Sequence, residues 1–415
     1  MIPRHRPPFG IAGLCKSLIP DFRFGKVELL ERAYADALNA PHAIWLPSAR
    51  YGIFQSITLG LDQLDHVYCP AFTCKVVHQA VRQTARPMSL VDSTDQHLLM
   101  QYDGRQNAGR YGVVLSEVFG YRYRDPQASP FLRNAALRIF DMAMCIPDAD
   151  DIERLIDRDV ALISFGLGKS LYAGWGGMAF TKNHETADRL REARNQDIYR
   201  DSAIAGIRKT AGVWLRTLAH STWLYELSRR SVNRRTQVAA IFPEVPAVAQ
   251  KLATAEWCQS PTQFQSKLAA GNLNRSHQFV QDRIEYSSIY RSQLQQLTYG
   301  SSDSSPELLT LFPDHNDAMS HFCIRVNASV RDELRRYLWE NGIDSATLFA
   351  FPDGADHDRF PNAARLTQQI IGLPLSNGLG CRCVRRICSL IHRFAATYPT
   401  TSGGRSNAIE ALRAA

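Results

Sequence analysis

The sequence predicts an α/β fold in which a mostly parallel sheet is covered by helices on both faces, giving three αβα layers, followed by a smaller C-terminal α/β domain. Two observations carry this prediction. Short apolar runs in the first half alternate with helix-like stretches, and several of the runs are continuously apolar. Such alternation is typical of parallel sheets, and continuous apolar runs are typical of strands buried on both faces.

Seven apolar runs in the first half are predicted strands. They are His42–Leu46, His66–Cys69, Pro87–Val91, Val113–Val118, Leu137–Phe140, Val160–Phe165 and Met178–Thr181. Helices are expected between them, for example over Tyr51–Leu61 and Thr73–Thr84. Ligands of such sheets bind at the carboxyl ends of the strands, so the residues directly after each run are the candidate functional residues.

The middle of the chain is predicted to carry a basic helical insertion over residues 201–250. It holds seven Lys or Arg residues against three Asp or Glu residues. A basic amphipathic stretch either packs against the protein with one solvated face or lies on an anionic membrane surface, and both interpretations stay open.

The last third is predicted to form the smaller domain. A long helix pattern covers Pro261–Leu297, and a Ser-rich surface loop follows at Gly300–Pro306. The domain is then built from a strand, a helix, an apolar run and a final helix, at His321–Val326, Val330–Asn341, Thr347–Phe351 and Val384–Phe394. We therefore expect a large domain over residues 1–260, a smaller one over 261–400 and a tail over 401–415.

The composition excludes several classes of protein. With 45% hydrophobic and 21% charged residues over 415 positions, the chain is neither disordered nor collagen-like. The net charge of +8 suits an anionic substrate, an acidic membrane or nucleic acid without choosing among them. Nine cysteines and a basic N-terminus that leads into no apolar run predict reduced thiols in a cytosolic protein. The cluster Cys381, Cys383, Cys388 and His392 matches no standard zinc spacing, so no metal is predicted.

Two charged residues follow predicted strands where both can reach one ligand. Asp141 follows the run Leu137–Phe140, and Lys169 lies in the glycine-rich stretch after Val160–Phe165. Pyridoxal phosphate needs such a pair, because a lysine forms its Schiff base and an aspartate pairs with its pyridine nitrogen. Taken singly, Lys169 also fits a solvated surface lysine and Asp141 a helix cap.

The order of several motifs resembles the DegT/StrS family of pyridoxal-phosphate-dependent sugar aminotransferases, which has the PLP-dependent transferase fold type I (aspartate aminotransferase-like). The resemblance runs through most of the chain. It rests on FGKVELLERAYADALNAPHAI (Phe24–Ile44), PSARYG (Pro47–Gly52), LGLDQLDHVYCPAFT (Leu59–Thr73), the Asp-x-Ala at Asp141, the Ser-Phe-x-x-x-Lys from Ser164 to Lys169, the Gly-x-Gly-Gly at Gly174–Gly177, RLREARN (Arg189–Asn195) and FPNAARLTQQIIGLPL (Phe360–Leu375).

The resemblance implies which residues hold the cofactor. Lys169 is the implied Schiff-base lysine and proton shuttle, and Asp141 the implied partner of the pyridine nitrogen. The phosphate would be bound by Ser164 together with Ser48, Ala49 and Arg50 at a helix N-terminus. Ser48 and Ser164 also fit ordinary caps, and Arg50 equally fits a surface arginine.

The chain departs from the family pattern at several positions. Ala49 stands where most members have a hydroxyl in the phosphate loop, and Cys74 stands where they stack an aromatic ring on the cofactor. Met144 replaces a polar residue three positions after the aspartate, and Glu117 replaces a frequent histidine near the substrate. The asparagine that usually reaches the phosphate from the partner subunit falls near Cys258.

The function implied by the resemblance is a cytoplasmic, homodimeric aminotransferase. It would move an amino group from an amino acid, L-glutamate, to a nucleotide-linked keto-sugar in polysaccharide or glycosylated natural-product biosynthesis. Its partners would be small molecules and not nucleic acid. Two alternatives stay open: a related enzyme, acting on a cyclitol or other non-nucleotide ketone or as a sugar dehydratase, and a non-enzymatic regulatory or scaffold descendant. Such dehydratases carry histidine at the lysine position, so Lys169 counts against that version.

Overall fold

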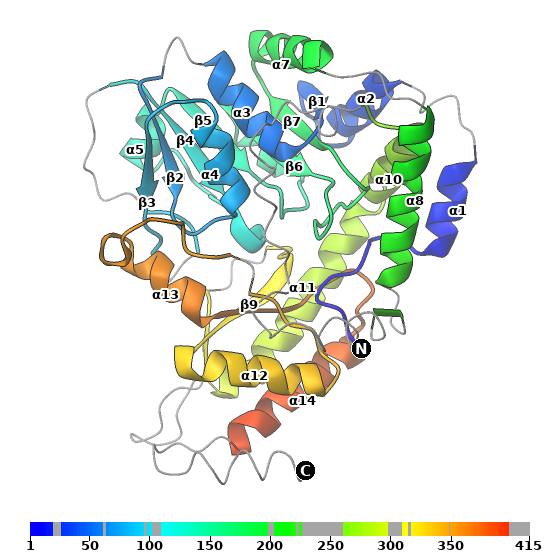
Figure 1. Ribbon diagram of the computed structural model, residues 1–415, viewed down its shortest axis with the longest axis vertical. Coiled ribbons are helices and arrows are strands. Elements are labelled where there is room, and N and C mark those ends of the chain that lie inside the picture. The colour runs from blue at the N-terminus through cyan, green and yellow to red at the C-terminus, as the bar shows by residue number, and fades with distance from the viewer. Residues whose placement is uncertain are drawn as a thin grey trace.

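The computed structural model describes residues 1–19, 26–60, 64–94, 98–101, 109–197, 203–220, 224–225, 260–297, 309–313, 317–347 and 349–397. Its centre is a sheet of seven strands in the order β1-β7-β6-β5-β4-β2-β3, shown in Figure 1. The strands are β1 (His42–Leu46), β2 (His66–Pro70), β3 (Met88–Val91), β4 (Tyr111–Ser116), β5 (Leu137–Asp141), β6 (Asp159–Ser164) and β7 (Gly177–Thr181). All seven predicted strands are confirmed, with shifts of two residues at most.

The sheet is mostly parallel, as predicted. Neighbouring strands from β3 to β6 are parallel, and β7 is the exception because it pairs antiparallel with both β6 and β1. Strands β1, β2, β4, β5 and β6 therefore run in the same direction. Their carboxyl ends lie at one edge of the sheet, where the candidate functional residues were expected.

Helices cover both faces of this sheet, which explains why the strand sequences are continuously apolar. In β6, Val160 and Leu162 pack into the core on one face, whereas Ala161 and Ile163 pack into the core on the other. The first face is covered by α3 (Ala49–Leu59), α4 (Lys75–Arg82) and α7 (His184–Asp197), and the second by α2 (Val27–Ala37) and α10 (Gln263–Leu273), with the short helices α5 (Pro130–Asn134) and α6 (Ala149–Glu153). The predicted three-layer arrangement is confirmed.

A second, smaller sheet follows in the last third of the chain. It is antiparallel, with the order β10-β9-β8, and consists of β8 (Leu309–Leu311), β9 (His321–Val326) and β10 (Ile370–Pro374). Its own core also includes residues of α11 (Ser276–Leu294), α12 (Ala328–Glu340), α13 (Pro361–Gln369) and α14 (Cys381–Thr397). Figure 1 shows these helices below the large sheet.

One prediction for this region was wrong. The single helix expected over Pro261–Leu297 is divided into α10 and α11, because Arg275 leaves the helical conformation with φ −108° and ψ 2°. The apolar run Thr347–Phe351 forms no strand in its described residues. The ring of Phe349, in this run, lies 5.3 Å from the ring of Phe72 and 5.2 Å from that of Phe119, measured between ring centroids. The apolar residues of the run therefore reflect aromatic packing of a loop.

The remaining helices are α1 (Ile11–Leu18), which packs on α10, and α8 (Ala203–Ala219). Helix α8 confirms a helix at the start of the predicted insertion, whose later part lies outside the described residues. The Ser-rich turn, Cys258 and the tail 401–415 also lie outside them. Within the described ranges, no helix combines the length and the apolar character needed to cross a bilayer.

Candidate active site

The expected site residues gather at the edge where the parallel strands end. Ser48 lies just after β1, Cys74 shortly after β2, Asp141 at the end of β5 and Ser164 at the end of β6. Lys169 lies in the loop that leaves β6. The sheet order places β4, β5 and β6 next to one another, so Asp141 occupies the middle of this edge.

Asp141 lies between a hydroxyl and the charge of Lys169. Its Oδ1 accepts the N–H of Ala143 at 3.2 Å, and its side chain is bonded to Ser116, whose hydroxyl also meets that of Thr73 at 2.8 Å. Burial raises the pKa of Asp141, while the nearby charge of Lys169 and the two hydrogen bonds act in the opposite direction. Among the described residues, no basic side chain comes within ion-pair distance of this carboxylate. It is therefore available to a cationic ligand.

Lys169 is carried by a tight turn of the glycine-rich stretch. Its backbone N–H donates to Gly166 at 3.3 Å, and Gly168 adopts a φ of +78° that a side chain would strain. The loop closes where Ala173 donates to the carbonyl of Phe165 at 3.0 Å. The side chain of Lys169 is half-buried, and its charge contributes to lowering the pKa of the buried His321. The charge of Lys169 therefore acts on both Asp141 and His321.

The N-terminus of α3 lies against the same edge. Ser48 caps this helix, because its Oγ accepts the N–H of Tyr51 at 3.0 Å. A Cβ on Gly177, the first residue of β7, would lie 2.4 Å from the carbonyl of Ile163 and 3.1 Å from the N atom of Ala49. Only glycine allows this close approach, which brings the N-terminus of α3 beside the end of β6. A helix N-terminus of this kind attracts phosphate.

Ser164, Arg50 and Cys74 complete the predicted set. Ser164 Oγ accepts the N–H of Gly166 at 3.2 Å, so this hydroxyl also turns the chain into the lysine loop. Burial lowers the pKa of Arg50, whereas the neighbouring Cys74 raises it. Arg50 is therefore a half-buried side chain next to Cys74 and not a fully solvated surface arginine.

A buried set of hydrogen bonds that the sequence did not reveal, called here the clamp, joins the loop of Lys169 to the loop of Asp141. The hydroxyl of Ser170 donates to the carbonyl of Met144 at 2.9 Å and accepts from Nη1 of Arg283 at 2.7 Å. Arg283, on α11, also donates to Asn377 at 3.0 Å and to the carbonyl of Met319 at 3.2 Å. Ser170 follows Lys169 directly, so this clamp ties the lysine loop to the loop of Asp141 and to the smaller sheet.

Glu117 does not lie where the resemblance placed it. Its side chain is buried and accepts from Arg154 at 2.7 Å and from the N–H of Tyr123 at 3.1 Å. Arg154 also contacts Asp151, which pairs with Arg122 at 2.8 Å. Glu117 therefore belongs to a buried ion network and cannot contact a substrate from the open edge.

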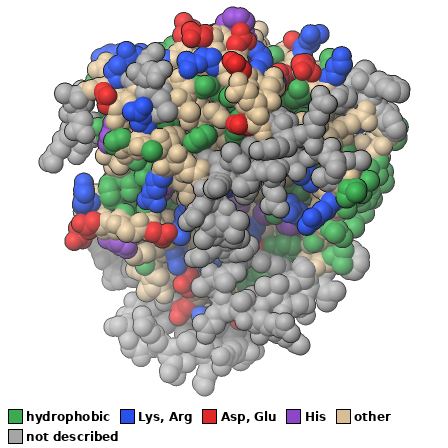
Figure 2. Space-filling view, turned by 45° about the horizontal axis from the view of Figure 1, so that its top comes forward, with side chains coloured by type: hydrophobic (Ala, Val, Ile, Leu, Met, Phe, Trp, Pro, Cys, Tyr) green, Lys and Arg blue, Asp and Glu red, His purple; other side chains and the backbone are tan. Residues whose placement is uncertain are grey.

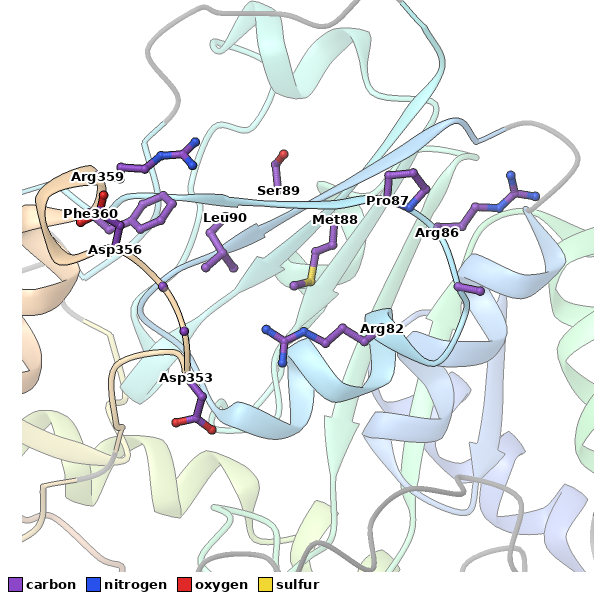
Figure 3. A pocket seen from close by; sticks show the side chains of 13 residues that line it. Arg82, Arg86, Pro87, Met88, Ser89, Leu90, Asp353, Asp356, Arg359 and Phe360 are labelled. Atoms are coloured by element: carbon purple, nitrogen blue, oxygen red, sulfur yellow. The ribbon is translucent and has the colours of Figure 1, made fainter.

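Two other groups of polar side chains lie away from this edge of the sheet. The loop of Asp353 and Asp356 lines a pocket at the free edge of β3, which Figure 3 shows, and Asp353 meets Lys75 at 3.3 Å in an exposed pair. In that view, Arg86 and Arg359 extend from opposite ends and converge on no common point. In the Cys/His cluster, His392 bonds to the carbonyl of Gln293 at 2.8 Å and Cys388 is buried in the core. The part of the chain that is described contains no group of three metal-ligating side chains.

Comparison with known proteins gives a family match and a fold match. Residues 262–392 match the model of the DegT/DnrJ/EryC1/StrS aminotransferase family. This segment covers α10 to α14 and contains neither Lys169 nor Asp141, so their assignment depends on the geometry above. No curated protein sequence matches the chain.

Solved structures match over nearly the whole chain. Spr1654 from Streptococcus pneumoniae, assigned as a sugar aminotransferase and solved in PMP and PLP forms, aligns with 16% identity and a TM-score of 0.67, covering 94% of this chain and 98% of its own. DesV from S. venezuelae aligns with 20% identity and a TM-score of 0.65, covering 92% and 93%. DesI, solved in the presence of its TDP-sugar product, aligns with 15% identity and a TM-score of 0.65, covering 95% and 92%.

These matches support the resemblance over residues 262–392 and confirm the fold that the sequence predicted. Residues 262–392 carry the signature of the DegT/DnrJ/EryC1/StrS aminotransferase family, and the chain as a whole has the fold type I architecture of sugar aminotransferases.

Proposed function

We propose that this protein is a pyridoxal-phosphate-dependent aminotransferase that moves an amino group from an amino acid, L-glutamate, to a nucleotide-linked keto-sugar. The observation that carries the proposal is the meeting of Lys169 and Asp141 at the carboxyl edge of the large sheet, opposite the N-terminus of α3. An amine, a carboxylate and a phosphate cradle in this arrangement fit one cofactor.

The residues at this edge of the sheet fit both the pyridine ring and the phosphate of the cofactor. The carboxylate of Asp141 has no basic side chain paired with it in the described chain, and a protonated pyridine nitrogen would supply the missing cation. The backbone N–H groups at Ala49 and Arg50, with the hydroxyl of Ser164, would hold the phosphate. Half-buried Arg50 would compensate for the hydroxyl that Ala49 lacks. Bound there, pyridoxal phosphate supplies an electron sink for the carbon that loses a proton.

Lys169 would carry out the proton transfers. Its Nζ, placed near Asp141 by the turn at Gly168, is the basic group that can take a proton from the donor carbon and return it to another carbon. The clamp of Ser170 and Arg283 would hold this amine in position. Cys74 would pack beside the ring with less contact area than an aromatic residue.

The substrate class is the finer part of the proposal. DesI, of the same fold, was solved with a TDP-sugar product, and the chain's net charge of +8 suits a pyrophosphate. We place the enzyme in the cytoplasm as a homodimer, within polysaccharide or glycosylated natural-product biosynthesis. A large domain over 1–260 would hold the cofactor, and a smaller one over 261–400 would close the site.

The test begins with the absorbance of the purified protein after addition of pyridoxal phosphate, for wild type and Lys169→Ala. Lysine-bound pyridoxal phosphate absorbs in the visible, so wild type should show the band and the variant should lack it. Adding L-glutamate should shift the wild-type band to the near ultraviolet. A panel of nucleotide-linked keto-sugars should then restore the visible band.

Each result has a defined meaning. A wild type that binds no cofactor would refute the enzyme and favour a scaffold role. A band that forms in wild type and responds to glutamate, but to no nucleotide-linked sugar, would keep the aminotransferase and refute the substrate class. Cyclitol ketones would be the next acceptors to test.

A further inference from the structure

The exposed apolar side chains of the described residues are concentrated on two adjacent helices. Seven large hydrophobic side chains are exposed, and only Leu167 lies elsewhere. The other six belong to α8, to α1 or to the residue after α1, and α1 contacts both α8 and α10. They are Ile204 at 77%, Ile207 at 69%, Leu215 at 68%, Ile11 at 55%, Leu18 at 52% and Ile19 at 63% exposure.

On α8 these side chains form one stripe. The exposed positions Ile204, Ile207, Ala211 and Leu215 follow one another at steps of three or four, the spacing of a single helix face, and exposed Arg208 lies four residues after Ile204. The opposite face holds the helix to the protein. Val213 is buried and packs against Gly174. A Cβ added to Gly174 would lie 2.8 Å from the side chain of Val213. The apolar stripe is thus a fixed outer surface of a packed helix.

The charge of this region has one sign. Helices α1, α8 and α10 together contain five Lys or Arg residues and no Asp or Glu. Lys209 and Arg216 turn toward the protein, one over the Trp175 ring at 4.7 Å and the other to the hydroxyl of Tyr172. Lys16 and Arg208 are exposed beside the apolar side chains. Figure 2 shows hydrophobic side chains, with Lys and Arg beside them, at the rim on the side of α1 and α8.

We propose that this surface, defined by Ile11, Lys16, Leu18, Ile19, Ile204, Ile207, Arg208 and Leu215 and called here the α1–α8 face, docks the enzyme on an anionic lipid bilayer. Isoleucine and leucine side chains enter the boundary between headgroups and acyl chains, while lysine and arginine meet the anionic headgroups. The exclusively basic charge of these helices favours an anionic partner over a neutral one. The exposed isoleucine and leucine side chains favour a bilayer over an acidic protein surface, which is polar. The proposal does not depend on the aminotransferase activity.

The experiment measures binding of the full-length protein to vesicles by co-sedimentation. Phosphatidylcholine vesicles with and without phosphatidylglycerol are compared at low and high salt. Wild type should bind the vesicles that contain phosphatidylglycerol, and salt should weaken this binding because it screens the charges. Phosphatidylcholine alone should bind much less.

Two variants separate the contributions to docking. Lys16→Gln/Arg208→Gln removes two exposed charges and should weaken binding about 25-fold, since each basic residue near an anionic surface contributes about fivefold. Ile204→Ser/Ile207→Ser/Leu215→Ser should weaken it at least about tenfold. The matched control is Arg382→Gln/Arg385→Gln on α14, which removes the same charge from exposed positions and should bind as wild type does.

Light scattering and thermal unfolding of every variant complete the test. All variants should melt as wild type does, because the substituted side chains are exposed. Unchanged vesicle binding by both test variants, or an equal loss in the α14 control, would overturn the proposal. So would a wild type that binds no vesicle and is converted to a smaller oligomer by the serine substitutions, because a second copy would then cover the face.

Discussion

Two carboxylates, Asp141 and Glu117, lie at neighbouring strand ends but have different surroundings. We propose a role in the reaction for the first and a role in stability for the second. Ser116 of β4 pairs in register with Asp141 of β5, and Glu117 follows Ser116 directly. One step along a strand turns a side chain to the other face. Asp141 therefore shares the open side with Ser116 and Lys169, whereas Glu117 enters the core and pairs with Arg154.

Asp141 is half-buried and Glu117 is fully buried, and the two side chains also differ in their partners. Burial raises the pKa of both side chains. Glu117 has protein partners, namely Arg154 and the N–H of Tyr123, although burial outweighs their effect on its pKa. Asp141 has a hydroxyl, one N–H and the nearby charge of Lys169. A carboxylate with few partners within the protein is a candidate for binding a ligand.

The largest expected effect is on stability, from Glu117→Leu. This change removes one of the two carboxylates that contact Arg154 and should lower the free energy of unfolding by about 3–5 kcal/mol in a urea titration. Asp353→Ala is the control, because it removes an ion pair with Lys75 whose side chains are 40% and 82% exposed. That variant should lose less than about 1 kcal/mol. Equal losses would contradict the role of Glu117 in the buried network.

The pH dependence of stability tests the same carboxylate without a large structural change. Burial raises the pKa of Glu117 from 4.5 to about 7, so the folded protein keeps a proton that the unfolded chain releases. Stability should therefore fall as pH rises from 4.5 to 7, by up to about 3 kcal/mol, and level off above. Glu117→Gln cannot titrate and should lack this slope. If the unfolding free energies of wild type and Glu117→Gln differ by the same amount at every pH, the raised pKa of Glu117 is excluded.

Asp141→Asn should show the opposite pattern, with activity lost and stability kept. Removing the charge should slow the half-reaction with L-glutamate about 100-fold, because the cofactor ring loses its counter-ion. The unfolding free energy should change by less than about 1 kcal/mol. Stopped-flow absorbance and urea titration measure the two quantities on one preparation. A loss of stability without a slower half-reaction would show that Asp141 supports the fold and not the reaction.

The smallest effect is expected from the clamp. Ser170→Ala removes the hydroxyl that joins Met144 and Arg283, and the half-reaction should slow about tenfold while cofactor affinity changes little. Ser292→Ala, which removes an exposed hydroxyl bonded to Ile289, should have no effect on the rate. A matching loss of cofactor affinity would show that the clamp builds the site instead of positioning Lys169.

The sequence determined the parts of the protein that depend on local pattern. Apolar runs predicted all seven strands of the large sheet, and several of these runs are continuous because burial on both faces requires apolar residues at every position. The rule that ligands bind at strand carboxyl ends selected Asp141 and Lys169. The signature Phe360–Leu375 lies within the segment that matches the family model.

Only the tertiary structure decided which side chains meet. No local pattern marks Arg283 as the partner of Ser170, since 113 positions separate them. The break at Arg275 interrupts an apolar period that continues on both sides, so the pattern alone extends the helix. The sequence identified a basic amphipathic stretch, but packing of Val213 against the glycine-rich loop decides which face of α8 stays outside. Contacts between distant positions fix these features, and a single sequence records composition and spacing but not contact.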